Sequence, residues 1–223
     1  MEKIPVLDQG YVALVESWGS DERIIEAARM STDKGFKGWP EDEKLLKFLW
    51  DNKHLTPFEM GGLILEVQAP IFVFREWHRH RTQSYNELSA RYTALPDMSY
   101  IPSVERIMNG KQASKNKQSS EAGFTEEQAV MLQADLKASY IHSRAIYDFL
   151  LEQGVAREIA RVIVPVGQYS RMRASANLRN WLAFLTLRQA PGAQWEIRQF
   201  ANAVGQIVAE KFPRTWALFS KEN

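Results

Sequence analysis

One stretch of the sequence organises the rest of the chain: Arg79-His80-Arg81-Thr82-Gln83-Ser84-Tyr85-Asn86-Glu87-Leu88-Ser89-Ala90-Arg91-Tyr92. Its arginines can form forked hydrogen bonds with phosphate, and its histidine titrates near neutral pH. The apolar run 70–74 lies directly upstream, so the basic stretch is attached to a buried segment rather than to a free tail. Cations held against a core need an anion, so the stretch is expected to bind phosphate or to pair with internal carboxylates.

The composition is that of a single globular domain. Of the 223 residues, 45% are hydrophobic and 25% are charged, and the formal net charge is +1, so any positive field must be local. There is no cysteine, which excludes disulfides, thiolate metal sites and cysteine nucleophiles; no metal site is predicted. No apolar run approaches about 18 residues and the N-terminus has no apolar core, so we expect a cytoplasmic protein that contacts no membrane.

Helical patterns outnumber strand patterns. Alternation and β-rich composition predict strands at 11–15, 63–68 and 168–175. Apolar periodicity and capping residues predict helices at 20–31, 41–50, 70–78, 125–150, 156–164, 177–188 and 193–212. The polar segment 109–123 is predicted to be a mobile loop, and we find neither an internal repeat nor a second domain.

Two patterns outside the basic stretch carry polar groups. Arg157 and Arg161 have i,i+4 spacing, which predicts that they lie on one face of the helix 156–164. Arg188 ends the helix that Asn177 caps, where core packing with a snorkelling arginine is the alternative to a functional role. The connector 54–59 presents a histidine, a hydroxyl and a carboxylate together, although, taken alone, it is better explained as a plain capping turn.

Arg79-His80-Arg81, seven residues and then Ser89 form the signature of the flavin-dependent thymidylate synthases, and this sequence resembles that family. Further blocks match in family order: 54–59, 69–72, 157–161 and 177–188. The resemblance covers nearly the full chain, with 109–123 as the poorest stretch. It implies an α+β fold, a sheet with flanking helices and a long C-terminal helical part, assembled as a homotetramer with shared active sites.

The resemblance also implies the reaction and its site. FAD would be reduced by NADPH and would act as the hydride source, and the methylene of 5,10-methylenetetrahydrofolate would be passed to dUMP, giving dTMP and tetrahydrofolate. The FAD contacts would be Thr56, Arg79, His80, Arg81, Thr82, Glu87, Asn177, Leu178 and Arg179. The dUMP contacts would be Glu76, Trp77, His78, Arg79, Glu87, Leu88, Ser89, Ala90, Arg91, Arg161 and Arg188, with the segment 89–91 supplied by another subunit.

The residue types agree with this chemistry. A nucleotide and a diphosphate-bearing flavin need several forked cations. An arginine beside N3 and O4 of uracil can stabilise the negative charge that makes C5 nucleophilic, and this catalytic role is assigned to Arg188. Without cysteine no thiolate can add to C6. Three positions depart from the family pattern: Met60 and Gly192 replace a common histidine, and Ala183 replaces a polar flavin contact. No Gly-x-Gly-x-x-Gly is present, so no dinucleotide is bound in Rossmann fashion.

Two other interpretations compete with this one. A nucleic-acid-binding module would use the arginines for phosphates and Tyr85 and Tyr92 for stacking, but Glu76 and Glu87 within the cluster would repel a nucleic-acid backbone, so we expect no nucleic-acid partner. A relative that binds flavin and nucleotide without turnover is the stronger alternative, because Ala183 and Gly192 depart from the pattern.

Overall fold

The computed structural model describes residues 1–114 and 120–222. Its main sheet has the strand order β1-β2-β3-β7-β4, and every neighbouring pair is antiparallel. The strands are β1 Lys3–Val6, β2 Gly10–Trp18, β3 Gly62–Pro70, β7 Tyr169–Asn177 and β4 Ser84–Glu87. The predicted strands at 11–15, 63–68 and 168–175 are confirmed as β2, β3 and β7. The sequence pattern does not indicate β1 and β4, because each has only four residues and little alternation.

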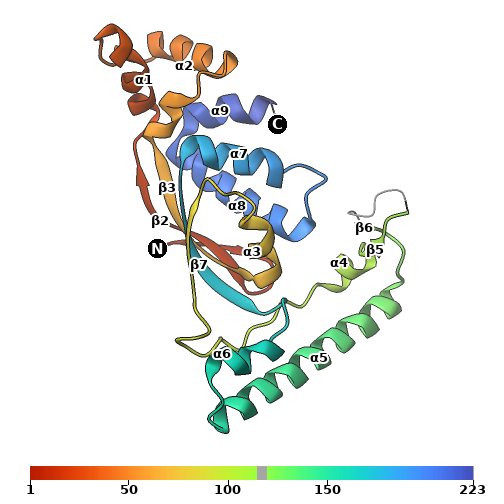
Figure 1. The fold of residues 1–223 in the computed structure, drawn as a ribbon. Coiled ribbons are helices and arrows are strands. Elements are labelled where there is room, and N and C mark those ends of the chain that lie inside the picture. Colours follow the sequence, from red (N-terminus) through yellow and green to blue (C-terminus); the bar gives the residue numbers. More distant parts are fainter. Residues whose placement is uncertain (115–119, 223) are drawn as a thin grey trace.

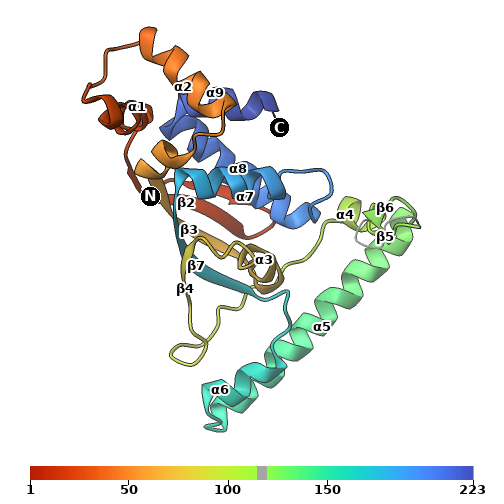
Figure 2. The same cartoon turned by 45° about the horizontal axis from the view of Figure 1, so that its top comes forward.

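Helices cover one face of this sheet and extend beyond both of its ends. They are α1 Asp21–Arg29, α2 Glu41–Asp51, α3 Ile71–Trp77, α4 Val104–Met108, α5 Glu126–Glu152, α6 Arg157–Ala160, α7 Leu178–Arg188, α8 Trp195–Lys211 and α9 Pro213–Glu222. Figures 1 and 2 show α7 and α8 against the sheet, α1, α2 and α9 at one end, and α5 and α6 at the other. The α+β fold with a helical C-terminal part is thus confirmed. Within the described ranges, no helix is long and apolar enough to cross a membrane.

The core lies between the sheet and α3, α7 and α8. Along β7 the side chains of Met172, Ala174 and Ala176 are buried, whereas those of Arg171 and Arg173 are exposed on the other face. This two-residue alternation is what a strand with one covered face requires. The opposite face of the sheet therefore presents charged side chains.

Capping residues place the helix starts where the sequence predicts them. The side chain of Ser20 accepts a hydrogen bond at the start of α1, and that of Asn177 accepts one from the amide of Asn180 at 3.0 Å. Thr125 and Gln128 form the predicted capping box of α5. Each of these signals is local, so the sequence alone identifies it.

Two predicted helices differ from the structure. Pro70 is the residue before α3 and not its first residue, because it still pairs with Tyr169 in the sheet and keeps a ψ of 145°. The helix predicted at 156–164 ends at Ala160 and continues as a 3₁₀ turn, η3 Arg161–Ile163. Pro165 keeps Val164 extended, and the change of helix type means that Arg157 and Arg161 do not share one continuous helical face.

The predicted mobile loop falls only partly on described residues. Its described part forms a short hairpin of β5 Lys111–Gln112 and β6 Ser120–Glu121. Residues 115–119 lie outside the described residues, so mobility of this segment stays a prediction. The helix α4 directly before it is not indicated by the sequence pattern, because it has only five residues.

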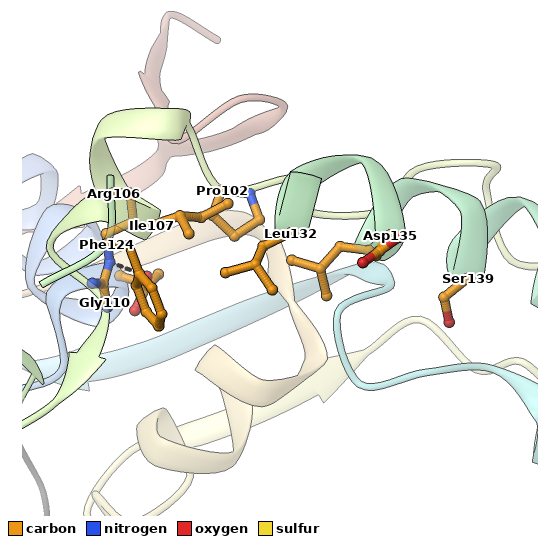
Figure 3. A pocket seen from close by; sticks show the side chains of 10 residues that line it. Pro102, Arg106, Ile107, Gly110, Phe124, Leu132, Asp135 and Ser139 are labelled. Atoms are coloured by element: carbon orange, nitrogen blue, oxygen red, sulfur yellow. Dashed lines mark hydrogen bonds and ion pairs between the residues drawn. The ribbon is translucent and has the colours of Figure 1, made fainter. Parts of the chain in front are cut away.

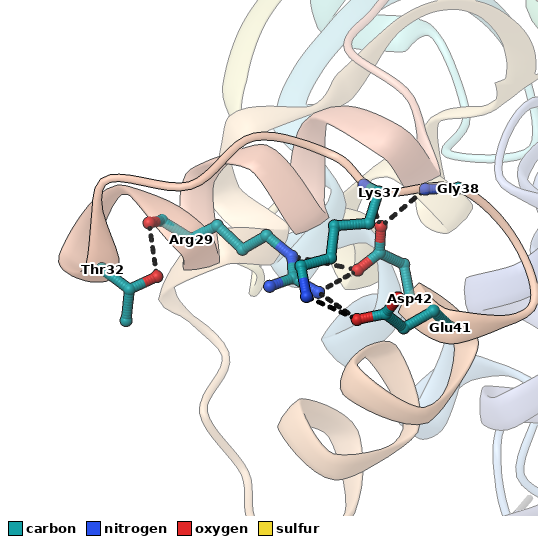
Figure 4. A network of polar contacts seen from close by, with 6 residues as sticks. All are labelled: Arg29, Thr32, Lys37, Gly38, Glu41 and Asp42. Atoms are coloured by element: carbon teal, nitrogen blue, oxygen red, sulfur yellow. Dashed lines mark hydrogen bonds and ion pairs between the residues drawn. The ribbon is translucent and has the colours of Figure 1, made fainter.

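A buried carboxylate fixes the loop between α1 and α2. Asp42 is fully buried and accepts hydrogen bonds from the Arg29 guanidinium and from the amides of Lys37 at 2.6 Å and Gly38 at 3.1 Å (Figure 4). Burial alone would raise the pKa of Asp42, but these donors outweigh burial and hold the pKa below its ordinary value of 3.8. The ionised carboxylate is therefore part of the folded structure.

Replacing Asp42 with asparagine is expected to lower the free energy of unfolding by about 2 kcal/mol at pH 7, because the charge-assisted hydrogen bonds are lost. Since folding lowers the pKa of Asp42, its stabilisation is present above the ordinary value of 3.8 and is lost as the pH falls below it. Urea unfolding of both proteins from pH 7 to 3 measures this. The control, Asp51→Asn, alters an exposed partner of Lys47 and should cost about 0.5 kcal/mol or less. Equal losses in the two variants would contradict a structural role for Asp42.

Candidate active site

The basic stretch begins where α3 ends, and two side chains fold it back toward β4. The indole of Trp77 is fully buried and donates to Oε1 of Gln83 at 3.0 Å. The hydroxyl of Tyr85 lies 2.7 Å from the carbonyl oxygen of His80 and 3.2 Å from that of Trp77. These contacts join the helix, the turn and the strand, so the backbone that carries His80 is fixed from both sides.

The guanidinium of Arg188, at the end of α7, lies against this turn. Its Nε donates to Nε2 of His80 at 2.9 Å, its Nη1 donates to the Glu76 carboxylate at 3.0 Å, and its Nη2 donates to the Glu76 carbonyl oxygen at 2.9 Å. Three of the five N–H donors of an arginine are therefore used within the chain. One donor on each terminal nitrogen is left for another acceptor.

The charges of this cluster are fixed by their surroundings. Burial, and secondly the charge of Arg188, lower the pKa of His80 to about 4. The imidazole is therefore neutral near pH 7, and because its Nε2 accepts a hydrogen bond, its proton is assigned to Nδ1. Burial raises the pKa of Glu76, and the nearby Arg188 only partly opposes this effect. Burial also lowers the pKa of His78, against the opposing charge of Glu87.

A cavity of about 790 Å³ opens between α7, the end of α2 and the turn η2 Thr56–Met60. The residues that line it are Trp50, Lys53, Leu55, Phe58, Glu59, Thr82, Arg179, Asn180, Leu182, Ala183, Thr186 and Phe219. Arg179 donates to the Glu59 carboxylate at 2.5 Å, and the amide group of Asn180 donates to the Thr82 carbonyl oxygen at 3.3 Å. The cavity thus adjoins residues that the resemblance assigns to FAD.

Polar groups at this end of the molecule lack partners. The buried indole N–H of Trp50 has no hydrogen-bond partner in the part of the chain that the structure describes. Arg79 and Arg81 are exposed, and within residues 1–114 and 120–222 no carboxylate pairs with either guanidinium. Forked cations without a paired carboxylate suit a ligand that carries phosphate, and Arg81 directly precedes Thr82, which lines the cavity. These residues therefore fit a diphosphate-bearing flavin.

The segment 89–91 lies elsewhere, beside α6 at the opposite end of the sheet from α2 (Figure 1). The amide of Leu88 donates to the Arg171 carbonyl oxygen at 2.8 Å, and Nε of Arg91 lies 3.3 Å from the Glu158 carboxylate. Both side chains of this ion pair are more than half exposed, at 57% and 55%, so the pair is weak. Arg161 in η3 is also exposed near this end.

The residues assigned to dUMP thus form two groups in one chain. Glu76, His78, Arg79 and Arg188 gather at the end of α3, whereas Ser89, Arg91 and Arg161 lie near α6. Glu87, in β4, lies between them along the chain. The side chains of Trp77 and Leu178 are fully buried, so any ligand contact of these two residues would involve their backbone.

A family match covers most of the chain. The family model described as "Thymidylate synthase complementing protein" matches residues 13–214. The chain belongs to this family. It is 45% identical over 218 residues to a flavin-dependent thymidylate synthase of Thermus thermophilus, covering 98% of this chain and 78% of the relative. It is 41% identical over 217 residues to that of Thermosipho africanus, covering 97% and 93%.

A solved structure has the same fold. The UMP/dUMP methylase PolB of Streptomyces cacaoi, bound with 5-Br dUMP, is 30% identical and superposes with a TM-score of 0.88, covering 98% of this chain and 97% of that one. The resemblance that the signature indicates, to a thymidylate synthase family, is therefore confirmed. The roles of individual site residues stay predictions.

The structure draws attention to residues that the resemblance assigns to neither FAD nor dUMP. Gln83 and Tyr85 lie inside the signature stretch, and Trp50, Glu59 and Asn180 lie at the cavity. Tyr85 and Asn180 contact backbone oxygens, and Glu59 contacts Arg179, 120 positions away in the sequence, so spacing carries no signal for these contacts. Of these residues, only Glu59 lies in the polar connector 54–59 that the sequence analysis describes.

Another pocket, of about 480 Å³, lies between α4 and α5 and holds none of the residues assigned to FAD or dUMP (Figure 3). Its side chains are largely apolar, including Phe124, Leu132 and Leu136, with the Arg106–Glu196 ion pair at one side. The residues that are predicted to bind FAD or dUMP therefore lie outside this pocket, at α3, α7 and α6.

Proposed function

We propose that the chain is a flavin-dependent thymidylate synthase that makes dTMP from dUMP, with 5,10-methylenetetrahydrofolate as the methylene donor, NADPH as the reductant and FAD as the cofactor. One observation carries the proposal: Arg188 is held by Glu76 and His80 with a free N–H on each terminal nitrogen. The names of the relatives and the methylase with the same fold support it. Because the chain has no cysteine, it fits a reducing compartment such as the cytoplasm.

Arg188 has the properties that activation of uracil needs. Its two remaining donors can bind O4 and N3, where negative charge grows as C5 becomes nucleophilic. Because Glu76 and His80 already orient the guanidinium, little reorganisation is needed when that charge develops. The neutral His80 adds no second charge, so Arg188 is the group that stabilises the developing anion.

Two residues of the FAD set, Thr82 and Arg179, line the cavity beside α7. Arg79 and Arg81 would bind the diphosphate, and Thr56, Thr82, Glu87, Asn177, Leu178 and Arg179 would complete the contacts. Ala183 lines the same cavity and offers no polar group. A water molecule or the side chain of Asn180 would therefore supply the polar contact with the flavin ring there. Once bound and reduced by NADPH, FAD would supply the hydride that a cysteine-free route requires.

A homotetramer would join the two groups of dUMP residues. Ser89, Ala90, Arg91 and Arg161 of one chain would meet Glu76, Trp77, His78 and Arg188 of another, with Glu87 and Leu88 nearby. The helix α5 supports self-association, since Met131, Ile141 and Phe149 are each more than half exposed. Apolar surface of this kind is typical of interfaces between chains.

One experiment tests the function. Purified protein should be yellow, NADPH should reduce its flavin under anaerobic conditions with and without dUMP, and addition of the folate should then yield dTMP. Flavin reduction without dTMP would favour the binding-only relative. A colourless protein that rejects added FAD would contradict both flavin interpretations. UMP offered in place of dUMP tests the second substrate that the name of the Streptomyces methylase suggests.

The flavin assignment predicts the effect of two substitutions. Arg79→Ala and Arg81→Ala should each weaken FAD binding by about 2 kcal/mol, or roughly 30-fold, because each removes a charge-assisted contact with phosphate. Titration of the apoprotein with FAD, followed by flavin fluorescence, measures this. The control Arg23→Ala removes an exposed arginine of α1 that pairs with Glu26. Unchanged FAD affinity in both site variants would remove these arginines from the flavin site.

A further inference from the structure

We propose that the side chain of His80 is a positioning residue for Arg188 and not a flavin contact. The inference rests on the proposed function, because it assigns to His80 a role in the activation of uracil. The family resemblance places His80 among the FAD contacts. The geometry points instead to an imidazole whose Nε2 is already used within the chain, by the Nε of Arg188 at 2.9 Å.

The imidazole completes a three-point support of the guanidinium. Two donors of Arg188 reach Glu76, one to its carboxylate and one to its carbonyl oxygen. These contacts hold the terminal nitrogens, but Nε lies on the other side of the group. The contact with His80 fixes that side, so the guanidinium plane cannot rotate about the Nη–Glu76 contacts.

His80 is itself held by the helix whose arginine it orients. Its ring lies edge-on against Phe184, with the ring centroids 4.9 Å apart, and Phe184 is one helical turn before Arg188 in α7. Its carbonyl oxygen lies 2.7 Å from the hydroxyl of Tyr85. Both the ring and the backbone of His80 are thus fixed, as a positioning residue requires.

The role needs a neutral imidazole. An imidazolium has an N–H on both nitrogens, so it could not accept the Nε–H of Arg188 and would repel the guanidinium. Burial lowers the pKa of His80 and so favours the neutral form, and the charge of Arg188, whose Nε contacts the ring, adds to this effect. The same neutral acceptor can be supplied by an amide oxygen.

Two substitutions separate positioning from flavin binding. His80→Leu removes the acceptor, and His80→Gln can place Oε1 near the position of Nε2. We expect His80→Leu to lower kcat for dTMP formation about tenfold or more, as misplacement of a catalytic group does. His80→Gln should restore most of that rate, and FAD affinity should stay within about twofold of wild type in both variants, as expected when no charge-assisted contact is lost.

The double variant supplies the decisive comparison. In an Arg188→Lys background the guanidinium is absent, so His80→Leu should cost less than about twofold, because residues that act as a unit are not additive. A full tenfold loss in that background, or a large fall in FAD affinity in both His80 variants, would overturn the proposal. Thermal unfolding of each variant identifies a loss that is due to misfolding.

Nitrogen NMR of ¹⁵N-histidine-labelled wild-type holoenzyme tests the contact without turnover. His80 should be neutral with its proton on Nδ1, and its Nε2 resonance should shift in Arg188→Lys. An unchanged resonance would overturn the proposal even if dTMP forms. If the resonance shifts in Arg188→Lys but the wild-type protein makes no dTMP, the result would instead contradict the proposed function while confirming that His80 contacts Arg188.

Discussion

Replacing Arg188 with lysine is expected to lower the rate of dTMP formation about 100-fold or more, which is the scale of removing one preorganised donor. Lysine keeps the positive charge but has no planar fork. It also has no group that could reproduce the contacts of Arg188 with both His80 and the two oxygens of Glu76. The loss falls mainly on kcat, because the charge on uracil grows in the transition state.

FAD content and NADPH oxidation distinguish this effect from general damage. Flavin content should be normal, and NADPH oxidation need not fall equally, since reduction of the flavin requires no activated uracil. The control Arg198→Lys changes an arginine of α8 that donates to the Pro191 carbonyl oxygen, away from the α3–α7 cluster. An Arg188→Lys enzyme with a near wild-type rate of dTMP formation would leave Arg188 a packing residue.

Mixing two inactive variants should restore activity if sites are shared between chains. Arg91 lies beside α6 and Arg188 at the end of α7, in the two separate groups of predicted dUMP residues. The Arg91→Ala and Arg188→Ala proteins should each be nearly inactive. In a randomly mixed 1:1 assembly, about a quarter of the sites would receive an intact Arg91 from one chain and an intact Arg188 from another.

Subunit exchange must be measured in the same sample, for example with one variant carrying an affinity tag. A mixture of Arg91→Ala with a tagged Arg91→Ala chain is the matched control and should stay inactive. Demonstrated exchange without recovered dTMP formation would mean that both arginines act from one chain, or that one of them is not in the site.

Local signals in the sequence predict much of the fold. Ser20, the Thr125–Gln128 pair and Asn177 each satisfy amides within a few residues, so their helix starts can be identified before any tertiary contact is known. The 3₁₀ turn after Ala160 and the short strand β4 depend on what packs against them. Periodicity carries no signal for such elements.

In the candidate site, too, the sequence predicts some features and only the tertiary structure shows the others. The family resemblance assigns Glu76, His80 and Arg188 to the site, but it does not predict their contacts with one another. The ion pair between Glu76 and Arg188 spans 112 positions in the sequence. It forms only because the sheet brings the end of α3 beside the end of α7. Sequence thus predicts the members of the site, and tertiary structure determines which atoms they present to a ligand.

The helix α5 offers a way to observe the association of one chain with another. Of its 27 residues only Ala129 and Tyr147 are buried in the chain, so little core holds its turns closed. Local opening then costs far less free energy than global unfolding, and the amide hydrogens of α5 exchange with solvent through fraying. Contact with a neighbouring chain would slow that exchange. Hydrogen exchange along α5 therefore measures association directly, in samples where no substrate turns over.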